Sequence, residues 1–444
     1  MHSDAVCSPE DKSSVLSEIW GDGGGDRRFS KYPRIPVKEL EKLRLRSDDP
    51  LDRYLEASKV DARKDDVVAR LKADAEAGSV PAQELWSQYS KVPDWVDWER
   101  VKRGQRVFWL NAPPITFLLL HFTLIFGVAA PKINKVLTAT GYLSRPTRVT
   151  FQRLLETTHW VLSCMADDGL REGSTGWEGC IRVRFLHASV RARLRNIAKT
   201  NPQLYNEAKL GIPINIEDMI TTILGFAVGP LERLPRLGFY VSKAEREDFC
   251  HAWRYIAYLS GIPEDVNPLA KGADYSVSFE GSIVLHSCHP DDSTIRLAQA
   301  LLTGMSYGAA ELSSDHKATF ELISGSRSTL PASVPVDPVT FEHRRLRFYG
   351  FYSQLTRIIL NNKYCDFLGL PKKKIGWVEW AGAYGVLMFF AVLTKICRML
   401  PFMRTWLINR NRSVLTRVIA AVLREKDPKF LLRYEPTPEK MREE

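Results

Sequence analysis

Helical periodicity is the feature that most limits what this chain can fold into. Apolar residues recur at three- and four-residue intervals, while strand-like alternation is scarce and no fixed-period repeat is present. Two segments have clear start signals, because Ser242 and Glu245 have capping-box spacing and Asn215 precedes two acids. We therefore predict a mainly α fold built around one large helical domain. The expected helices are 146–165, 181–198, 216–228, 243–260, 293–306 and 338–362.

The N-terminal part differs from this domain in composition. Residues 1–50 are polar and include three consecutive glycines, which is typical of a largely disordered leader. A highly charged helical pattern follows from Leu51, so residues 51–90 are expected to form a helical extension. The main domain is expected at 91–370, with Pro93 in the first turn of a helix that ends near Trp109.

The first strongly apolar stretch, 115–130, is too short to cross a bilayer. It lacks about four of the roughly 20 apolar residues that a span needs, and it contains His121. We expect a buried core helix.

The second apolar stretch, 380–394, has cations on both sides. Lys372, Lys373 and Lys374 precede it, arginines and a lysine follow it, and Glu379 is the only acid between residues 370 and 412. With the basic amphipathic pattern at 403–424, this predicts a membrane-associating region over 371–430 and a tail at 431–444. A core helix with a solvated basic face is the alternative.

Charge and cysteine usage narrow the function classes. The formal charge is +10 and the pI is about 9.2, but no nucleic-acid-binding motif is present, so no nucleic-acid partner is expected. The seven cysteines are scattered and lack CxxC spacing, which favours a reducing compartment. No dinucleotide-binding, P-loop or nucleophile-elbow motif occurs in a credible context.

The helical segment 181–194 carries the most informative side chains. Arg184, His187 and Arg191 fall within about 60° of one another on a helix. Two neighbouring cations depress the pKa of an imidazole and keep it neutral, as a metal ligand must be. The arginines are at a spacing that suits the carboxylates of a haem. A partly exposed histidine on a basic face is the alternative interpretation.

The preceding helix places polar groups on an otherwise apolar face. Arg153, Thr157, Trp160 and Cys164 share that face, with Glu156 at its edge. Such groups need partners inside a helical domain, and a buried cofactor with polar edges would supply them. An ordinary interhelical salt bridge, between Arg184 and either Glu156 or an acid elsewhere, is the alternative.

These two helices together resemble a known family. An Arg-x-x-x-Thr helix (Arg153, Thr157) followed by Arg-x-x-His-x-x-x-Arg (Arg184, His187, Arg191) is similar to the core of fungal mpaB oxygenases and bacterial rubber oxygenases. The likeness covers roughly residues 90–410. Further matches are Trp95–Trp98 with Arg103–Gln105, Ile214–Met219 and Arg344–Tyr349.

The resemblance implies a globin-like helical domain around a buried haem b. It assigns His187 as the axial ligand of the iron, Arg184 as the residue that orients the haem or its propionate, and Arg191 as a further cofactor contact. Arg153 and Thr157 would line the pocket, with Thr157 on the distal side. The implied reaction is dioxygen-dependent cleavage of a carbon–carbon double bond in an isoprenoid chain.

The chain departs from the rubber oxygenases at one position. Those enzymes carry a lysine before the distal threonine, whereas this chain has Glu156, which we expect to act as an acid–base group or to hold water. Because residues 1–50 contain no apolar signal region, rubber is not the expected substrate. The expected substrate is a prenylated or other lipidic small molecule, and the expected context is secondary metabolism.

The expected location is the cytosolic face of the endoplasmic reticulum or another endomembrane, with the cytoplasm as the alternative. Two rival functions stay open from the sequence. One is a non-enzymatic lipid-binding or scaffold protein, and the other is a haem peroxidase or hydroxylase.

Other histidines are weaker candidates. His251, with Arg254 on the helix that starts at Ser242, is the reserve iron ligand. His121 and His159 are expected to be packing residues. The cluster His286, Cys288 and His289 lies in an expected loop and lacks a fourth zinc ligand.

Overall fold

The computed structural model describes residues 28–62, 64–139, 147–329, 337–371 and 377–423. These residues form helices, turns and irregular segments with no β-strand, so the mainly α prediction is confirmed. One hydrophobic core runs through them, from Leu40 near the start to Ile419 near the end. The predicted units 51–90, 91–370 and 371–430 therefore share one core in a single large domain.

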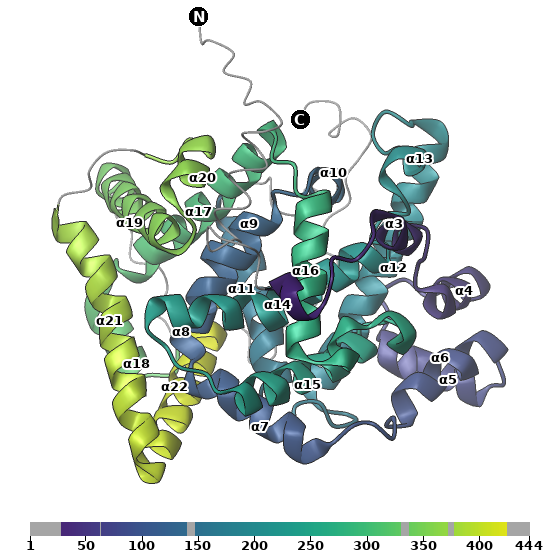
Figure 1. Cartoon of the computed structure of the whole chain (residues 1–444), viewed down its shortest axis with the longest axis horizontal. Coiled ribbons are helices and arrows are strands. Elements are labelled where there is room, and N and C mark those ends of the chain that lie inside the picture. The colour runs from purple at the N-terminus through teal and green to yellow at the C-terminus, as the bar shows by residue number, and fades with distance from the viewer. Residues whose placement is uncertain (1–27, 63, 140–146, 330–336, 372–376, 424–444) are drawn as a thin grey trace, which may run out of the picture.

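Short helices form the N-terminal part. They are α2 (Arg28–Lys31), α3 (Val37–Arg44), α4 (Asp49–Ala57), α5 (Val67–Glu76) and α6 (Val80–Ser90). Of these, α3 to α6 lie on the right of Figure 1. The expectation of a disordered leader is wrong for residues 28–50, because Leu40 is fully buried within α3. Residues 1–27 and the predicted tail 431–444 lie outside the described residues.

The main body begins at α7 (Trp98–Leu110), which Asp97 caps through the backbone N–H groups of Glu99 and Arg100. Pro93 therefore precedes this helix instead of lying in its first turn. The other long helices of the body are α11 (Thr147–Cys164), α12 (Thr175–Thr200), α14 (Ile216–Arg233), α15 (Lys243–Leu259), α16 (Ala273–Ser287), α17 (Asp292–Leu312) and α19 (Pro338–Ile359). The capping box at Ser242 and Glu245 is present at the start of α15.

The apolar stretch 115–130 is buried but is not one regular helix. It consists of α8 (Ala112–Leu118), a π-helical turn η1 (Leu119–Leu124) and α9 (Ile125–Gly127). A π turn holds an extra residue in the helical ladder, and such turns are frequent at functional sites. His121 lies in this turn and is fully buried.

Shorter elements connect the body. They are α10 (Pro131–Ala139), α13 (Glu207–Leu210), η2 (Leu234–Leu237), η3 (Glu264–Val266), η4 (Pro268–Lys271), α18 (His316–Ser324) and α20 (Asn362–Phe367). Because α16 continues to Ser287, His286 is helical and does not lie in a loop as predicted. The chain's last two described helices are α21 (Trp377–Met399) and α22 (Pro401–Leu423), which form a hairpin at one edge of the molecule (Figure 1).

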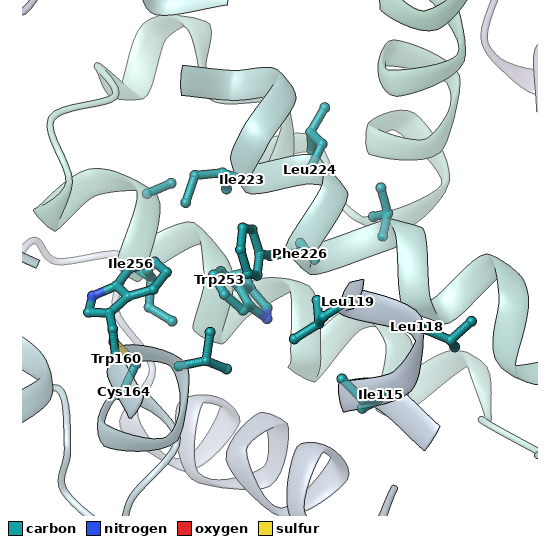
Figure 2. Packing of buried hydrophobic residues seen from close by; sticks show 14 of the residues in the cluster. Ile115, Leu118, Leu119, Trp160, Cys164, Ile223, Leu224, Phe226, Trp253 and Ile256 are labelled. Carbon is teal, nitrogen blue, oxygen red and sulfur yellow. The ribbon is translucent and has the colours of Figure 1, made fainter. Parts of the chain in front are cut away.

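Aromatic side chains from three helices meet in the core (Figure 2). Trp160 of α11, Phe226 of α14 and Trp253 of α15 have ring centroids 5.5–6.1 Å apart. Each is buried, so together they fix the relative positions of these helices. Nearby, α15 packs closely on α7, where a Cβ atom on Gly104 would lie 2.3 Å from the carbonyl oxygen of Asp248.

Candidate functional site

The six predicted site residues lie on two helices that contact each other. Arg153, Glu156 and Thr157 are on α11, and the other three are on α12. The end of α11 and the start of α12 approach closely, because a Cβ atom on Gly176 would lie 2.7 Å from the Cα atom of Cys164. The thiols of Cys164 and Cys180 also meet across this contact, 3.7 Å apart.

His187 lies near the middle of α12 and is half-buried. Its Nδ1 atom is buried and has no hydrogen-bond partner among the described residues. Burial, together with the nearby Arg191 cation, lowers the pKa of His187 to about 4. The imidazole is therefore neutral at physiological pH, and its nitrogen lone pair is not used by the protein.

Arg184 is buried beside His187 and paired with a carboxylate from the N-terminal part. Its guanidinium donates two hydrogen bonds to Asp48, of 2.5 and 2.7 Å, and both side chains are 2% exposed. Further donations go to Tyr89 Oη at 2.8 Å and Gln88 Oε1 at 2.9 Å. Burial disfavours the guanidinium cation, but Asp48 more than offsets this and raises the pKa of Arg184.

Arg191 forms the same kind of ion pair with a second aspartate, which follows Asp48 by one helical turn of α4. It donates to both carboxylate oxygens of Asp52 at 2.7–3.0 Å and to the carbonyl oxygen of Ile214 at 3.0 Å. Ile214 has a φ of 50°, which is unfavourable for a β-branched residue. Its carbonyl is thus held toward Arg191 directly before Asn215, whose side chain caps α14.

The two arginines have protein partners where the sequence analysis expected haem carboxylates. The contact with a haem stays a prediction, whereas their bidentate pairs with Asp48 and Asp52 tie α12 to the N-terminal part. Sequence reasoning missed both aspartates. Their spacing of four residues places them on one face of a helix, which was the available signal.

On α11, Arg153 and Glu156 form a buried ion pair. The Nη1 atom of Arg153 lies 3.0 Å from Oε2 of Glu156, and the side chains are 8% and 2% exposed. The hydroxyl of Thr157 donates to the carbonyl oxygen of Arg153 at 3.1 Å, which leaves its oxygen able to accept. This helix therefore carries an acid, a cation and a hydroxyl within four residues in a largely apolar interior.

The other buried histidines differ from His187 in their contacts. His251 Nε2 accepts a hydrogen bond of 3.1 Å from the backbone N–H of Asp97, so that lone pair is engaged. His121 Nδ1 lies 3.0 Å from Thr356 Oγ1, while its Nε2 has no partner among the described residues. The buried histidine nitrogens without a hydrogen-bond partner among the described residues are thus His187 Nδ1, His121 Nε2 and His286 Nε2.

No group of three or more His, Cys, Asp or Glu side chains in the described part of the chain is arranged to hold a metal ion. His289 Nε2 lies 2.9 Å from the carbonyl oxygen of His286, within its own turn.

Comparisons with known proteins agree with the sequence resemblance. Residues 110–393 match the family model of the ER-bound oxygenase mpaB/B′/rubber oxygenase catalytic domain. A search of curated proteins gives no match. A solved structure titled "Structure of Latex Clearing Protein LCP in the closed state" is similar to the chain, with 16% identity and a TM-score of 0.46. The match covers 85% of this chain and 95% of that one.

Proposed function

Because the chain belongs to the mpaB/B′ and rubber oxygenase family, we propose that it is a haem b-dependent oxygenase in which His187 would hold the iron. When bound, the haem would supply the binding and activation of dioxygen. The proposed reaction is oxidative cleavage of a carbon–carbon double bond in a prenylated or other lipidic small molecule.

The observation that carries this proposal is the state of His187. An iron ligand must be a neutral imidazole with a free lone pair; the His187 imidazole is neutral, and its buried Nδ1 atom has no hydrogen-bond partner in the described part of the chain. A buried polar atom without a partner is costly in a finished protein interior. A metal bound by one ring nitrogen would use the lone pair that the protein leaves free.

Arg184 and Arg191 act, in this proposal, mainly by positioning α12. Each guanidinium already holds a carboxylate in both of its parallel donor positions, which is the strongest arrangement available to arginine. The pairs fix the rotation of α12 about its axis and therefore the direction of His187. They also balance the positive charge that would otherwise surround the imidazole.

The residues of α11 would face the reacting side. Thr157 offers a hydroxyl to water or to a polar group of the substrate, and Glu156 offers a carboxylate that can hold water or move a proton. The ion pair with Arg153 keeps Glu156 fixed in the interior. The aromatic residues next along α11, including Trp160, provide an apolar environment that excludes bulk water.

The partner of this site would be a lipidic substrate delivered at a membrane. We propose that the protein associates with the cytosolic face of the endoplasmic reticulum or another endomembrane, and functions in secondary metabolism. The supporting observation is the exposed apolar face of α21.

Absorption spectroscopy of the purified protein, loaded with haem b, tests the cofactor. Wild type should give a Soret band with a one-to-one haem content, and His187→Ala should lose the band or shift it strongly. His251→Ala and His121→Ala are matched controls, because each removes another buried imidazole and should keep the spectrum. Retention of the full spectrum in His187→Ala, with loss in either control, would show that another helix holds the iron.

Turnover assays separate the rival functions. An oxygenase consumes dioxygen with a prenylated test substrate and gives carbonyl products without added peroxide. Activity that requires hydrogen peroxide would instead indicate a peroxidase. A wild-type protein that takes up no haem under any loading condition would favour the non-enzymatic alternative.

A further inference from the structure

One face of α21 is apolar and open to solvent. The stretch Ala381–Met399 is long and apolar enough to cross a membrane, yet only 28% of it is buried. A narrow stripe that includes Ala383, Leu387 and Cys397 packs against the body, and Leu387 lies in a cluster with Leu355 of α19. The opposite face exposes Tyr384, Met388, Phe389, Val392, Ile396 and Met399.

The course of the chain shows that α21 cannot span a bilayer in this fold. Only Leu400 separates α21 from α22, which turns back and runs along it (Figure 1). On α22, Leu407 and Ile408 are buried, and Asn411 donates a hydrogen bond of 2.9 Å to the backbone carbonyl of Trp109 in α7. Both ends of the hairpin therefore return to the same side of the molecule.

The turn of the hairpin extends the exposed apolar face onto α22. Phe402 is 70% exposed and Trp406 is 51% exposed, and they follow Met399, which is 76% exposed. Exposed aromatic and aliphatic side chains of this size rarely gather on the surface of a monomer without a binding partner. Trp406 is of the type that favours a membrane–water boundary.

The charges around this face favour a lipid leaflet over a second copy of the chain. Lys395 and Arg410 are exposed beside it, and the chain has a net charge of +10. In a twofold dimer through the same face, these cations would approach their own copies. An anionic leaflet instead attracts them while it accepts the apolar side chains between them.

We propose that the outer face of the α21–α22 hairpin lies in the headgroup boundary of an anionic leaflet, as a monotopic anchor. The apolar side chains are spread along the whole of α21, which suits a helix in the plane of the membrane. Phe389 and Phe402 enter the acyl region, and Lys395 and Arg410 contact lipid phosphates. This anchor rests on the membrane association in the proposed function and specifies which segment makes it. Its test does not depend on haem.

Sedimentation with preformed vesicles tests the anchor on the full chain. Wild type should bind vesicles of phosphatidylcholine with 30% phosphatidylserine, and 1 M salt should weaken the binding severalfold without abolishing it. The double variant Phe389→Glu, Phe402→Glu should bind at least tenfold more weakly. Leu45→Glu is the matched control, because Leu45 is as exposed as Phe402 (72% and 70%) and directly follows α3, which lies away from the hairpin in Figure 1; this variant should bind as wild type does.

The alternatives give different results. Complete release by salt would overturn the apolar part of the proposal, as would unchanged binding by the double variant with a native circular dichroism spectrum. A lipid-free dimer that the double variant abolishes would assign the face to a second copy. Loss of haem binding with intact vesicle binding would overturn the proposed function and leave the anchor standing.

Discussion

Replacing Asp48 by asparagine removes the negative charge that faces the buried guanidinium of Arg184. The two side chains are 2% exposed, so water cannot take over the role of the carboxylate. Breaking one side of a buried ion pair costs about 3–5 kcal/mol, because the remaining charge stays in the interior. Tyr89 and Gln88 remain as acceptors for Arg184, so we expect a loss near the lower limit, about 3 kcal/mol.

Urea unfolding of the haem-free protein at pH 7 measures this loss. The matched control is Asp265→Asn, which makes the same chemical change in the exposed pair with Arg46, whose side chains are 40% and 64% exposed. That change should cost about 1 kcal/mol or less, and high salt should remove its effect. Adding Arg184→Met to Asp48→Asn should restore part of the stability, since no unpaired charge then remains. Equal, small losses in Asp48→Asn and Asp265→Asn would refute the argument that Arg184 depends on a buried counterion.

Three further predictions concern the site and its packing. The pKa of His187 is about 4 in the fold, so between about pH 6.5 and pH 4 only the unfolded chain binds a proton on this imidazole. The contribution of His187 should leave the stability unaffected above about pH 7 and lower it by about 2 kcal/mol at pH 5. His187→Gln should remove that loss in urea titrations of the haem-free protein, and an unchanged pH slope would contradict it. Thr157→Val should keep the Soret band but lower turnover, because it removes only the hydroxyl. Unchanged turnover in Glu156→Gln would exclude an acid–base role for the Glu156 carboxylate. Gly308→Ala should lower the stability by about 1–3 kcal/mol, because its Cβ atom would lie 2.1 Å from a phenyl ring of α11; Gly382→Ala, with open space, should not. Equal melting temperatures for the two variants would contradict that packing.

Local patterns in the sequence predicted most of the helices that carry the site. Ser242 and Glu245 form their capping box because both partners lie within one helical turn. The grouping of Arg184, His187 and Arg191 likewise follows from helical spacing, and it holds in α12. Such features depend on neighbours in the chain, which a single sequence displays directly.

Other features depend on contacts between distant segments. The short helix α3 is rich in charge, and the burial of Leu40 in the hydrophobic core makes it an ordered part of the fold. The prediction of a leader failed there for that reason. The π turn around His121 is equally non-local, because its apolar sequence is compatible with a regular helix and the packing of the surrounding helices selects the extra residue.

The partners of the arginines are the clearest case of such dependence. From their spacing, these cations were expected to meet a cofactor, with a salt bridge from Arg184 to an acid elsewhere as the alternative. Asp48 and Asp52 are 136 and 139 residues away along the chain. No periodicity relates such positions, so the pairing becomes visible only in the folded structure.

That separation has a consequence for the growing polypeptide on the ribosome. The two aspartates are synthesised long before their arginines, and α4 has no buried cation to dock against until α12 has emerged. Docking of the N-terminal helices is therefore a late event, and chains that stop before Arg184 should be recognised by chaperones and proteases as unfinished. Fragments that lack the N-terminal helices have the opposite defect, because they contain the arginines without the aspartates. A polypeptide that starts at residue 110, where the family match begins, would carry two guanidiniums into its interior without their carboxylates, so the boundary of the catalytic domain in sequence is not a boundary for folding.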